Sequence, residues 1–200
     1  LTVGTNGDRI RIDNHFWQDT GSGQYSVNAV EFADGTVWSQ DVLRSLALQG
    51  TGVSETLTGY TSNEVIDGGF GNDTLNGQAG DDVLRGGSGN DTLNGGDGND
   101  QLFGDAGQDT LRGDAGNDVL RAGEGDTLAG GTGSDTYVFE RGDGFTVISD
   151  SDTSAGRRDV VRFGAGIVAS EVTVRRSSNA LWLTVGTNGD RIRIDNHFWQ

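Results

Sequence analysis

Aspartate recurs with a fixed period in the middle of the chain, and this spacing is the clearest sign of chemistry in the sequence. From residue 73 to residue 135 an aspartate recurs every nine residues, with a single step of eight. The set consists of Asp73, Asp82, Asp91, Asp100, Asp109, Asp118, Asp126 and Asp135. Carboxylate oxygens are the ligands that hard cations bind in proteins. A lattice of regularly spaced carboxylates therefore predicts a row of cation sites, whereas a glycosidase-type centre uses one carboxylate pair.

A nine-residue repeat surrounds these aspartates and predicts the element that positions them. Read from residue 50, ten blocks hold one register with a single deletion. The blocks are GTGVSETLT, GYTSNEVID, GGFGNDTLN, GQAGDDVLR, GGSGNDTLN, GGDGNDQLF, GDAGQDTLR, GDAGNDVLR, AGEGDTLA and GGTGSDTYV. Position four is Gly in the last eight blocks, which indicates a backbone conformation that a side chain would obstruct. Position two varies among Gly, Gln78, Asp105 and Asp114, so we expect its geometry to be more permissive.

An apolar residue stands at position eight of every block, two places after the carboxylate. These residues are Leu57, Ile66, Leu75, Leu84, Leu93, Leu102, Leu111, Leu120, Leu128 and Tyr137. We expect each block to form a six-residue turn and a three-residue strand, with the position-eight side chain pointing inward.

The inward row alone does not provide enough energy for folding. Burying one Leu contributes roughly 1.5–3 kcal/mol, whereas ordering nine residues costs about 1–2 kcal/mol per residue in backbone entropy. With two blocks per coil, aspartates two blocks apart stack at about the 4.8 Å strand spacing. Two carboxylates at that distance repel by roughly 3 kcal/mol at an effective dielectric constant near 20. The roll is therefore expected to be unstable until a cation binds.

Calcium fits this arrangement better than magnesium, because Ca²⁺ accepts six to eight oxygens in flexible geometry and Mg²⁺ keeps its waters. The two predicted files are Asp73, Asp91, Asp109, Asp126 and Asp82, Asp100, Asp118, Asp135. Three gaps in each file give about six Ca²⁺ ions, the only cofactor expected. Glu55 and Glu64 occupy the same position in the first two blocks, and whether they bind calcium is left open. Asp126 follows the deletion, so its gap with Asp109 is expected to be distorted.

The composition excludes several other partners. The formal charge is -16, and the 14 basic residues form no basic run, so we expect neither nucleic acid nor an anionic membrane surface as a partner. The chain has no Cys, which excludes a disulfide framework and thiolate zinc sites. No stretch approaches the roughly 20 apolar residues of a membrane span. We expect any export signal to lie outside these 200 residues.

The flanks follow a different pattern, and we divide the chain into 1–49, 50–138 and 139–200. Alternating runs at 25–32 and 172–176 predict strands, and the pairs at 6–7, 34–35 and 188–189 predict tight turns. Ser39 is expected to cap a short helix near 39–47. The flanks are thus predicted to be a small, mostly antiparallel β unit. Its expected core includes Trp17, Trp38, Phe163 and Trp182.

A second, much longer repeat joins the two ends of the chain. The segment LTVGTNGDRIRIDNHFWQ occurs at 1–18 and again at 183–200, an offset of 182 residues. The chain is therefore expected to be slightly more than one unit of a longer tandem array. Residues 1–49 would then be the C-terminal half of a preceding flank unit, and neighbouring units would be partners.

The blocks at 50–138 resemble the haemolysin-type calcium-binding repeats of RTX proteins, and GGTGSDTYVFERGDG resembles the exit from such repeats. The flanking GDRIRIDNHF and VEFADGTVWS are similar to the haemolysin-type calcium-binding related segment that accompanies them. The resemblance implies an all-β fold, namely a right-handed parallel β-roll (RTX β-solenoid). It also implies type I secretion and folding that waits for extracellular calcium.

No catalytic site is expected in this chain. The sequence has no G-x-S-x-G and no H-E-x-x-H motif. His15 and His197 are equivalent residues of the repeated segment, for which we expect a structural role, and Arg157 and Arg158 are expected to be solvated loop charges.

Two functions remain open. The first is a secreted or cell-surface structural module, adhesin-like, with an unidentified surface ligand as a further partner. The second is the secretion and folding appendage of an RTX enzyme or toxin whose catalytic domain lies elsewhere.

Overall fold

The computed structural model describes residues 2–3, 8–9, 29–152 and 156–195. The chain divides into two compact units, Leu1–Ala47 and Leu48–Gln200. The expected core residue Trp17 and both histidines lie outside the described residues. Among the residues described, no helix is both long and apolar enough to cross a membrane.

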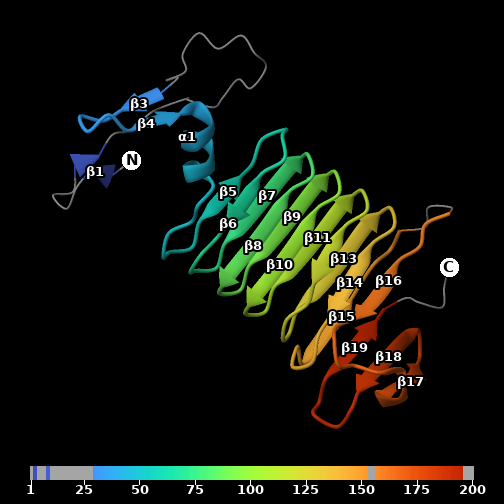
Figure 1. The fold of residues 1–200 in the computed structure, drawn as a ribbon. Coiled ribbons are helices and arrows are strands. Elements are labelled where there is room, and N and C mark those ends of the chain that lie inside the picture. Colours follow the sequence, from blue (N-terminus) through green and yellow to red (C-terminus); the bar gives the residue numbers. More distant parts are fainter. Residues whose placement is uncertain (1, 4–7, 10–28, 153–155, 196–200) are drawn as a thin grey trace. The chain divides into compact units, whose positions relative to one another are not determined.

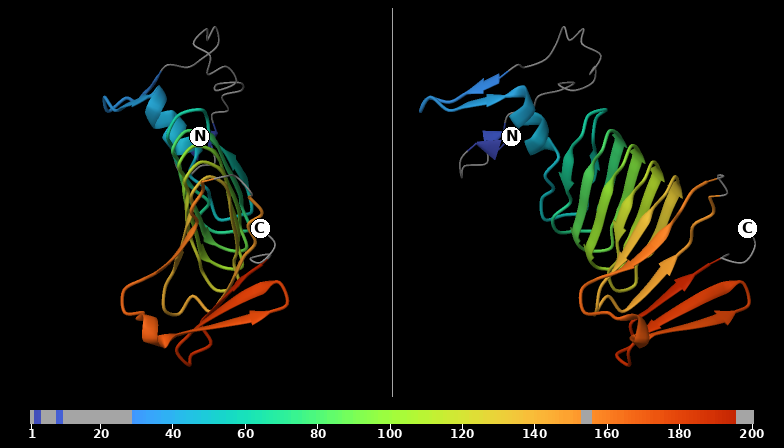
Figure 2. Two further views of the ribbon diagram at one scale, coloured as in Figure 1. Left: turned by 90° about the vertical axis from the view of Figure 1, so that its right-hand side faces the viewer. Right: turned by 45° about the vertical axis from the view of Figure 1, so that its right-hand side comes forward.

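The second unit is a parallel β-roll, as the repeat predicts. Successive strands alternate between two sheets, so that two blocks make one coil (Figures 1 and 2). Leu75 pairs with Leu93, and Leu84 pairs with Leu102, each in parallel register and 18 residues apart. The strands of the first sheet, in chain order, are β5 Thr56–Thr58, β7 Thr74–Ala79, β9 Thr92–Asp97, β11 Thr110–Ala115, β13 Thr127–Thr132 and β15 Phe145–Ile148. Those of the second sheet are β6 Val65–Asp67, β8 Val83–Ser88, β10 Gln101–Ala106, β12 Val119–Arg121, β14 Thr136–Phe139 and β16 Val160–Phe163.

The position-eight side chains form the core between the two sheets, which confirms the inward direction predicted for them. Every one from Ile66 to Tyr137 is at most 3% exposed. Leu57, in the first coil, is half-buried against the same core. From β6 to β13 each strand thus contributes one buried apolar side chain to the core, and β14 contributes both Tyr137 and Phe139.

The turn backbone explains where glycine is required. At position four φ lies well above the left-handed helical region, for example 135° at Gly89 and 138° at Gly98, and side chains rarely adopt such values. Position two also has positive φ, but its geometry is more permissive than that of position four, as predicted. Gln78, Asp105 and Asp114 adopt φ of 81°, 64° and 70° there, close to the left-handed region that polar side chains tolerate.

This difference predicts unequal costs for two glycine substitutions. In Gly89→Ala the new methyl group would collide with the carbonyl oxygen of Gly71 on the preceding coil. Backbone strain of about 1–3 kcal/mol then adds to overpacking of about 1–3 kcal/mol. Gly69→Gln, at φ 83° close to the 81° of Gln78, places its Cβ 2.9 Å from the nearest atom, the Thr51 carbonyl oxygen, and should cost about 1–2 kcal/mol. Thermal unfolding at saturating calcium measures both losses, and equal losses would show that position four is not special.

The sheets continue past residue 138, where the sequence repeat places the end of the roll. β15 pairs in parallel with β13, and β16 with β14. Beyond them β17 Val172–Ser177, β18 Ala180–Val185 and β19 Arg191–Ile194 form an antiparallel meander, with the 3₁₀ helix η1 Ala169–Glu171 before it. β19 also pairs in parallel with β15, so the meander extends the first sheet. Phe163 and Trp182 are half-buried in this region.

The first unit holds β1 Thr2–Val3, β2 Asp8–Arg9, β3 Ala29–Glu31, β4 Val37–Ser39 and α1 Gln40–Ala47. β3 and β4 form an antiparallel hairpin whose turn contains Gly35 at φ 88°. The Val42 amide donates to Ser39 Oγ, at the start of α1. Trp38 packs edge-on against Phe32.

The long sequence repeat reappears as a structural repeat. In the first copy Thr2 pairs with Arg9 across β1 and β2. In the second copy Thr184 pairs with Arg191 across β18 and β19, the same register displaced by 182 residues. The same residues therefore make the same antiparallel pair in both units.

Candidate metal sites

The eight repeat aspartates form two continuous ladders inside the turns. All eight are at most 2% exposed. One carboxylate oxygen of each, Oδ1, accepts a hydrogen bond from the position-six amide of the preceding coil. The Asp73 amide donates to Asp91 Oδ1 at 2.7 Å, and the Asp100 amide to Asp118 Oδ1 at 2.8 Å. The structure therefore brings each predicted file together in the predicted order.

The second carboxylate oxygen, Oδ2, is buried without a hydrogen-bond partner in seven of the eight aspartates. These are Asp73, Asp82, Asp91, Asp100, Asp109, Asp118 and Asp135. A buried acceptor without a partner costs about 1–3 kcal/mol, and more when it is charged. A regular row of such atoms requires a positively charged partner, and a calcium ion between turns would provide one.

Glycine at position one leaves room beside each of these oxygens. A methyl group added to Gly86 would lie 2.5 Å from Asp91 Oδ2 and 2.8 Å from the carbonyl oxygen of Gly104 on the next coil. At Gly68 the corresponding distances, to Asp73 Oδ2 and the Gly86 carbonyl oxygen, are 2.8 and 2.6 Å. A carboxylate oxygen and a carbonyl oxygen therefore face one small space, and both are ligand types that calcium accepts.

Burial disfavours the charged form of these carboxyls and so raises their pKa. Burial, together with the charges of neighbouring carboxylates, raises the pKa of Asp82, Asp109 and Asp118 to about 7. Burial likewise raises the pKa of Asp91 and Asp100. A bound cation would favour the charged form and reverse this effect.

A second ladder, at position five, was not predicted from the sequence. The Asn90 amide donates to Asn72 Oδ1 at 2.8 Å, and the Asn99 amide to Asp81 Oδ1 at 2.8 Å. This ladder runs toward the preceding coil, opposite to the aspartate ladder. The signal was present in the sequence, since position five carries a Ser, Asn, Asp or Gln in every block except the shortened one.

The ends of the files differ from the middle. Glu64 Oε2 accepts the Tyr60 amide of its own turn at 2.9 Å, and Glu55 Oε2 accepts the Thr51 amide at 2.6 Å. Asp126 keeps the ladder bond from the Asp109 amide at 2.8 Å, so this hydrogen bond is not distorted by the deletion. Its Oδ2 nevertheless accepts the Gly123 amide at 2.6 Å. These three carboxylates are therefore already satisfied within their own turns.

Comparison with protein families agrees with this geometry. The RTX calcium-binding nonapeptide repeat matches in four copies, at residues 58–93, 94–126, 103–137 and 125–145. The haemolysin-type calcium binding protein related domain matches residues 1–42. The chain contains RTX calcium-binding nonapeptide repeats. Its RTX repeats imply calcium binding, and the number of ions stays a prediction.

The RTX roll is similar to parts of larger proteins. The iron-regulated protein FrpA of Neisseria meningitidis serogroup C is 36% identical over 63 residues, which is 32% of this chain and 6% of that protein. The solution structure of the AlgE6R3 subunit from the Azotobacter vinelandii mannuronan C5-epimerase is 25% identical, with a TM-score of 0.33, over 73% of this chain and 72% of that one. The extracellular lipase LipA from Serratia marcescens is 16% identical, with a TM-score of 0.26, over 74% of this chain and 37% of that one.

Proposed function

We propose that this chain is a calcium-triggered folding module of an exported bacterial protein, in which it acts as a structural, adhesin-like segment. The observation that carries the proposal is the row of buried, unpartnered Oδ2 atoms on seven repeat aspartates. Each atom costs free energy in the roll and gains a partner only when a cation enters. These seven aspartates, together with Asp126 by its place in the same file, are the proposed ligands.

The same physics supports an extracellular site of action. Extracellular calcium modules bind with dissociation constants of about 10⁻⁴–10⁻³ M, far above the cytosolic calcium concentration. The chain would remain unfolded inside the cell, which suits export by the type I route that the RTX family implies. Because binding and folding are coupled across several stacked sites, the transition is expected to be cooperative.

The repeated hairpin supports a structural role in an array. The 18-residue segment is identical in its two copies and pairs in the same register at Thr2 with Arg9 and at Thr184 with Arg191. Tandem copies of one fold extend a chain without adding a new active site. We therefore propose a module without catalysis of its own.

A second candidate is the appendage of an RTX enzyme or toxin. It is favoured by the match to FrpA, in which the similar segment is 6% of a longer chain. The reading frame of the parent protein distinguishes the two proposed functions. A single roll after a catalytic domain would support the enzyme or toxin appendage, and several rolls in tandem would support the structural array.

A calcium titration followed by circular dichroism tests the folding switch. In EGTA the chain is expected to show mostly disordered signal, with β signal rising steeply as calcium is added. Magnesium at equal concentration should not produce it, because Mg²⁺ requires near-octahedral geometry. Light scattering in the same titration monitors association. A compact, β-rich chain in EGTA would refute the switch.

A further inference from the structure

One aspartate file continues beyond the last nonapeptide. The Asp135 amide donates to Asp159 Oδ1 at 3.1 Å, as the Asp118 amide does to Asp135 Oδ1 at 2.9 Å. The position-five ladder continues too, since the Arg158 amide donates to Ser134 Oγ at 2.9 Å. Asp159 therefore occupies position six of one more turn, although its sequence lacks the repeat motif.

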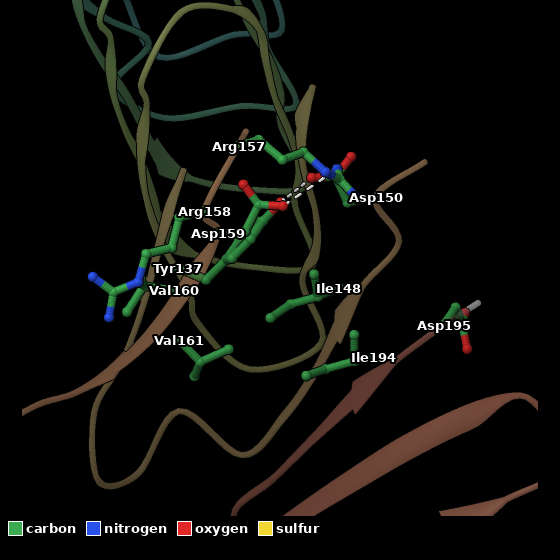
Figure 3. Close-up of a pocket in the computed structure, with 10 residues that line it drawn as sticks. All are labelled: Tyr137, Ile148, Asp150, Arg157, Arg158, Asp159, Val160, Val161, Ile194 and Asp195. Atoms are coloured by element: carbon green, nitrogen blue, oxygen red, sulfur yellow. Dashed lines mark hydrogen bonds and ion pairs between the residues drawn. The ribbon is translucent and has the colours of Figure 1, made fainter. Parts of the chain in front are cut away.

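A third carboxylate joins this end of the file. Oxygen atoms of Asp135, Asp150 and Asp159 all lie within 4.8 Å of one another. Asp150 is oriented by the Tyr137 hydroxyl, which donates to its Oδ2 at 2.7 Å (Figure 3). The Tyr137 hydroxyl in turn accepts the Gly130 amide at 2.9 Å, so its direction is determined by the roll.

Asp135 supplies independent evidence that a ligand is missing from this cluster. Its side chain is fully buried, and its Oδ2 has no hydrogen-bond partner. Such an oxygen is stabilised when a cation lies beside it.

A single guanidinium does not balance this cluster. Arg157 Nη1 lies 3.3 Å from Asp159 Oδ2 and 3.7 Å from Asp152 Oδ2, and its side chain is only 14% exposed. Arg157 is thus ion-paired, contrary to the solvated loop charge expected from the sequence. In Figure 3 the Arg158 guanidinium points away from the carboxylates. Four carboxylates therefore face one nearby cationic side chain.

The cluster is accessible to an ion. It borders a cavity of about 410 Å³ between the last strands of the two sheets, with Ile148, Val161 and Ile194 in its wall. Asp159 keeps 24% of its side chain exposed at this cavity, which leaves room for waters to complete a coordination shell. The donors are all oxygen, which favours a hard divalent cation over zinc or copper.

We infer that Asp135, Asp150 and Asp159 bind a calcium-type cation that closes the C-terminal end of the roll, outside the nonapeptide motif. This site rests on the proposed function only through Asp135, which also ends the predicted file. Its other two ligands come from the connection that joins β15 to β16. The ion would hold this connection against the last repeat turn.

The test compares Asp150→Asn and Asp159→Asn with Asp195→Asn, which lies on the same cavity but pairs with Arg193 at 2.9 Å. Asn at 159 can still accept the Asp135 amide, and Asp150 is outside the ladder, so both variants should fold at saturating calcium. Equilibrium dialysis is expected to show one bound calcium fewer in each, and no change in Asp195→Asn.

Terbium, which substitutes for calcium, adds a local readout. Its luminescence, excited through the adjacent Tyr137, should be lost in Asp150→Asn and Asp159→Asn and be displaced by calcium in the wild type. Wild-type stoichiometry and luminescence in both variants would overturn the site. If instead the other seven repeat aspartates bound nothing, the wild type would retain one ion and the two variants none.

Discussion

Asp100→Asn is expected to raise sharply the calcium concentration needed for half-folding. Asp100 borders two gaps of its file, toward Asp82 and toward Asp118. Each occupied site stabilises the fold by about 2.7 kcal/mol when calcium is a hundred times its dissociation constant. Losing two sites would cost about 5 kcal/mol, which equals the whole stability of many domains. The Asn oxygen can still accept the Asp82 amide, so the loss would report on calcium and not on the ladder.

Asp81→Asn is the matched control, because it removes the same charge from an adjacent turn. Asp81 stands in the position-five ladder between Asn63 and Asn99, where Asn is already accepted. Its calcium midpoint should stay close to that of the wild type. Glu55→Ala should also have the smaller effect, because the Glu55 carboxylate is satisfied by its own turn. Similar midpoints for Asp100→Asn and Asp81→Asn would contradict the assignment of position six as the ligand.

The repeat made the centre of this fold predictable, because each position carries one chemical role. In every block the apolar residue stands two places after the carboxylate, as Leu93 follows Asp91. This constant spacing alone predicts an inward core and a carboxylate file. The pairing of Leu75 with Leu93 confirms the coil of two blocks. Because similar turns stack on one another, residues at the same repeat position two blocks apart become neighbours in the structure.

Other features depended on geometry that the period does not contain. The positive φ at Gln78 was not predicted, because variation in residue type shows that a position accepts side chains and not which backbone conformation it has. Asp159 was missed because the spacing between Asp135 and Asp159 is 24 residues, which no nine-residue search finds. Its place in the file is determined by the strand pairing of β16 with β14. The end of the roll therefore has to be found from tertiary structure.

Acid is expected to affect the chain in opposite directions with and without calcium. Burial raises the pKa of Asp82, Asp109 and Asp118 to about 7 in the roll, whereas an unfolded Asp titrates near 3.9. Between about pH 4 and pH 7 the folded chain therefore binds more protons than the unfolded chain. Without calcium, stability conferred by these protons is fully present below about pH 4 and is lost as the pH rises through about 7.

Calcium reverses the sign, because it binds these carboxyls only when they are ionised. Calcium folds an unfolded chain, whose Asp side chains titrate near 3.9. From pH 7.5 to about pH 5 the calcium midpoint should therefore change little, and below about pH 4 it should rise by about tenfold per pH unit for each proton displaced by one ion. Circular dichroism across this range checks this, in buffer freed of metal by a chelating resin and then with added calcium. Asp109→Asn removes one of the titrating carboxyls and should flatten both slopes. A calcium midpoint that stayed constant below about pH 4 would show that these carboxyls are not the groups calcium binds.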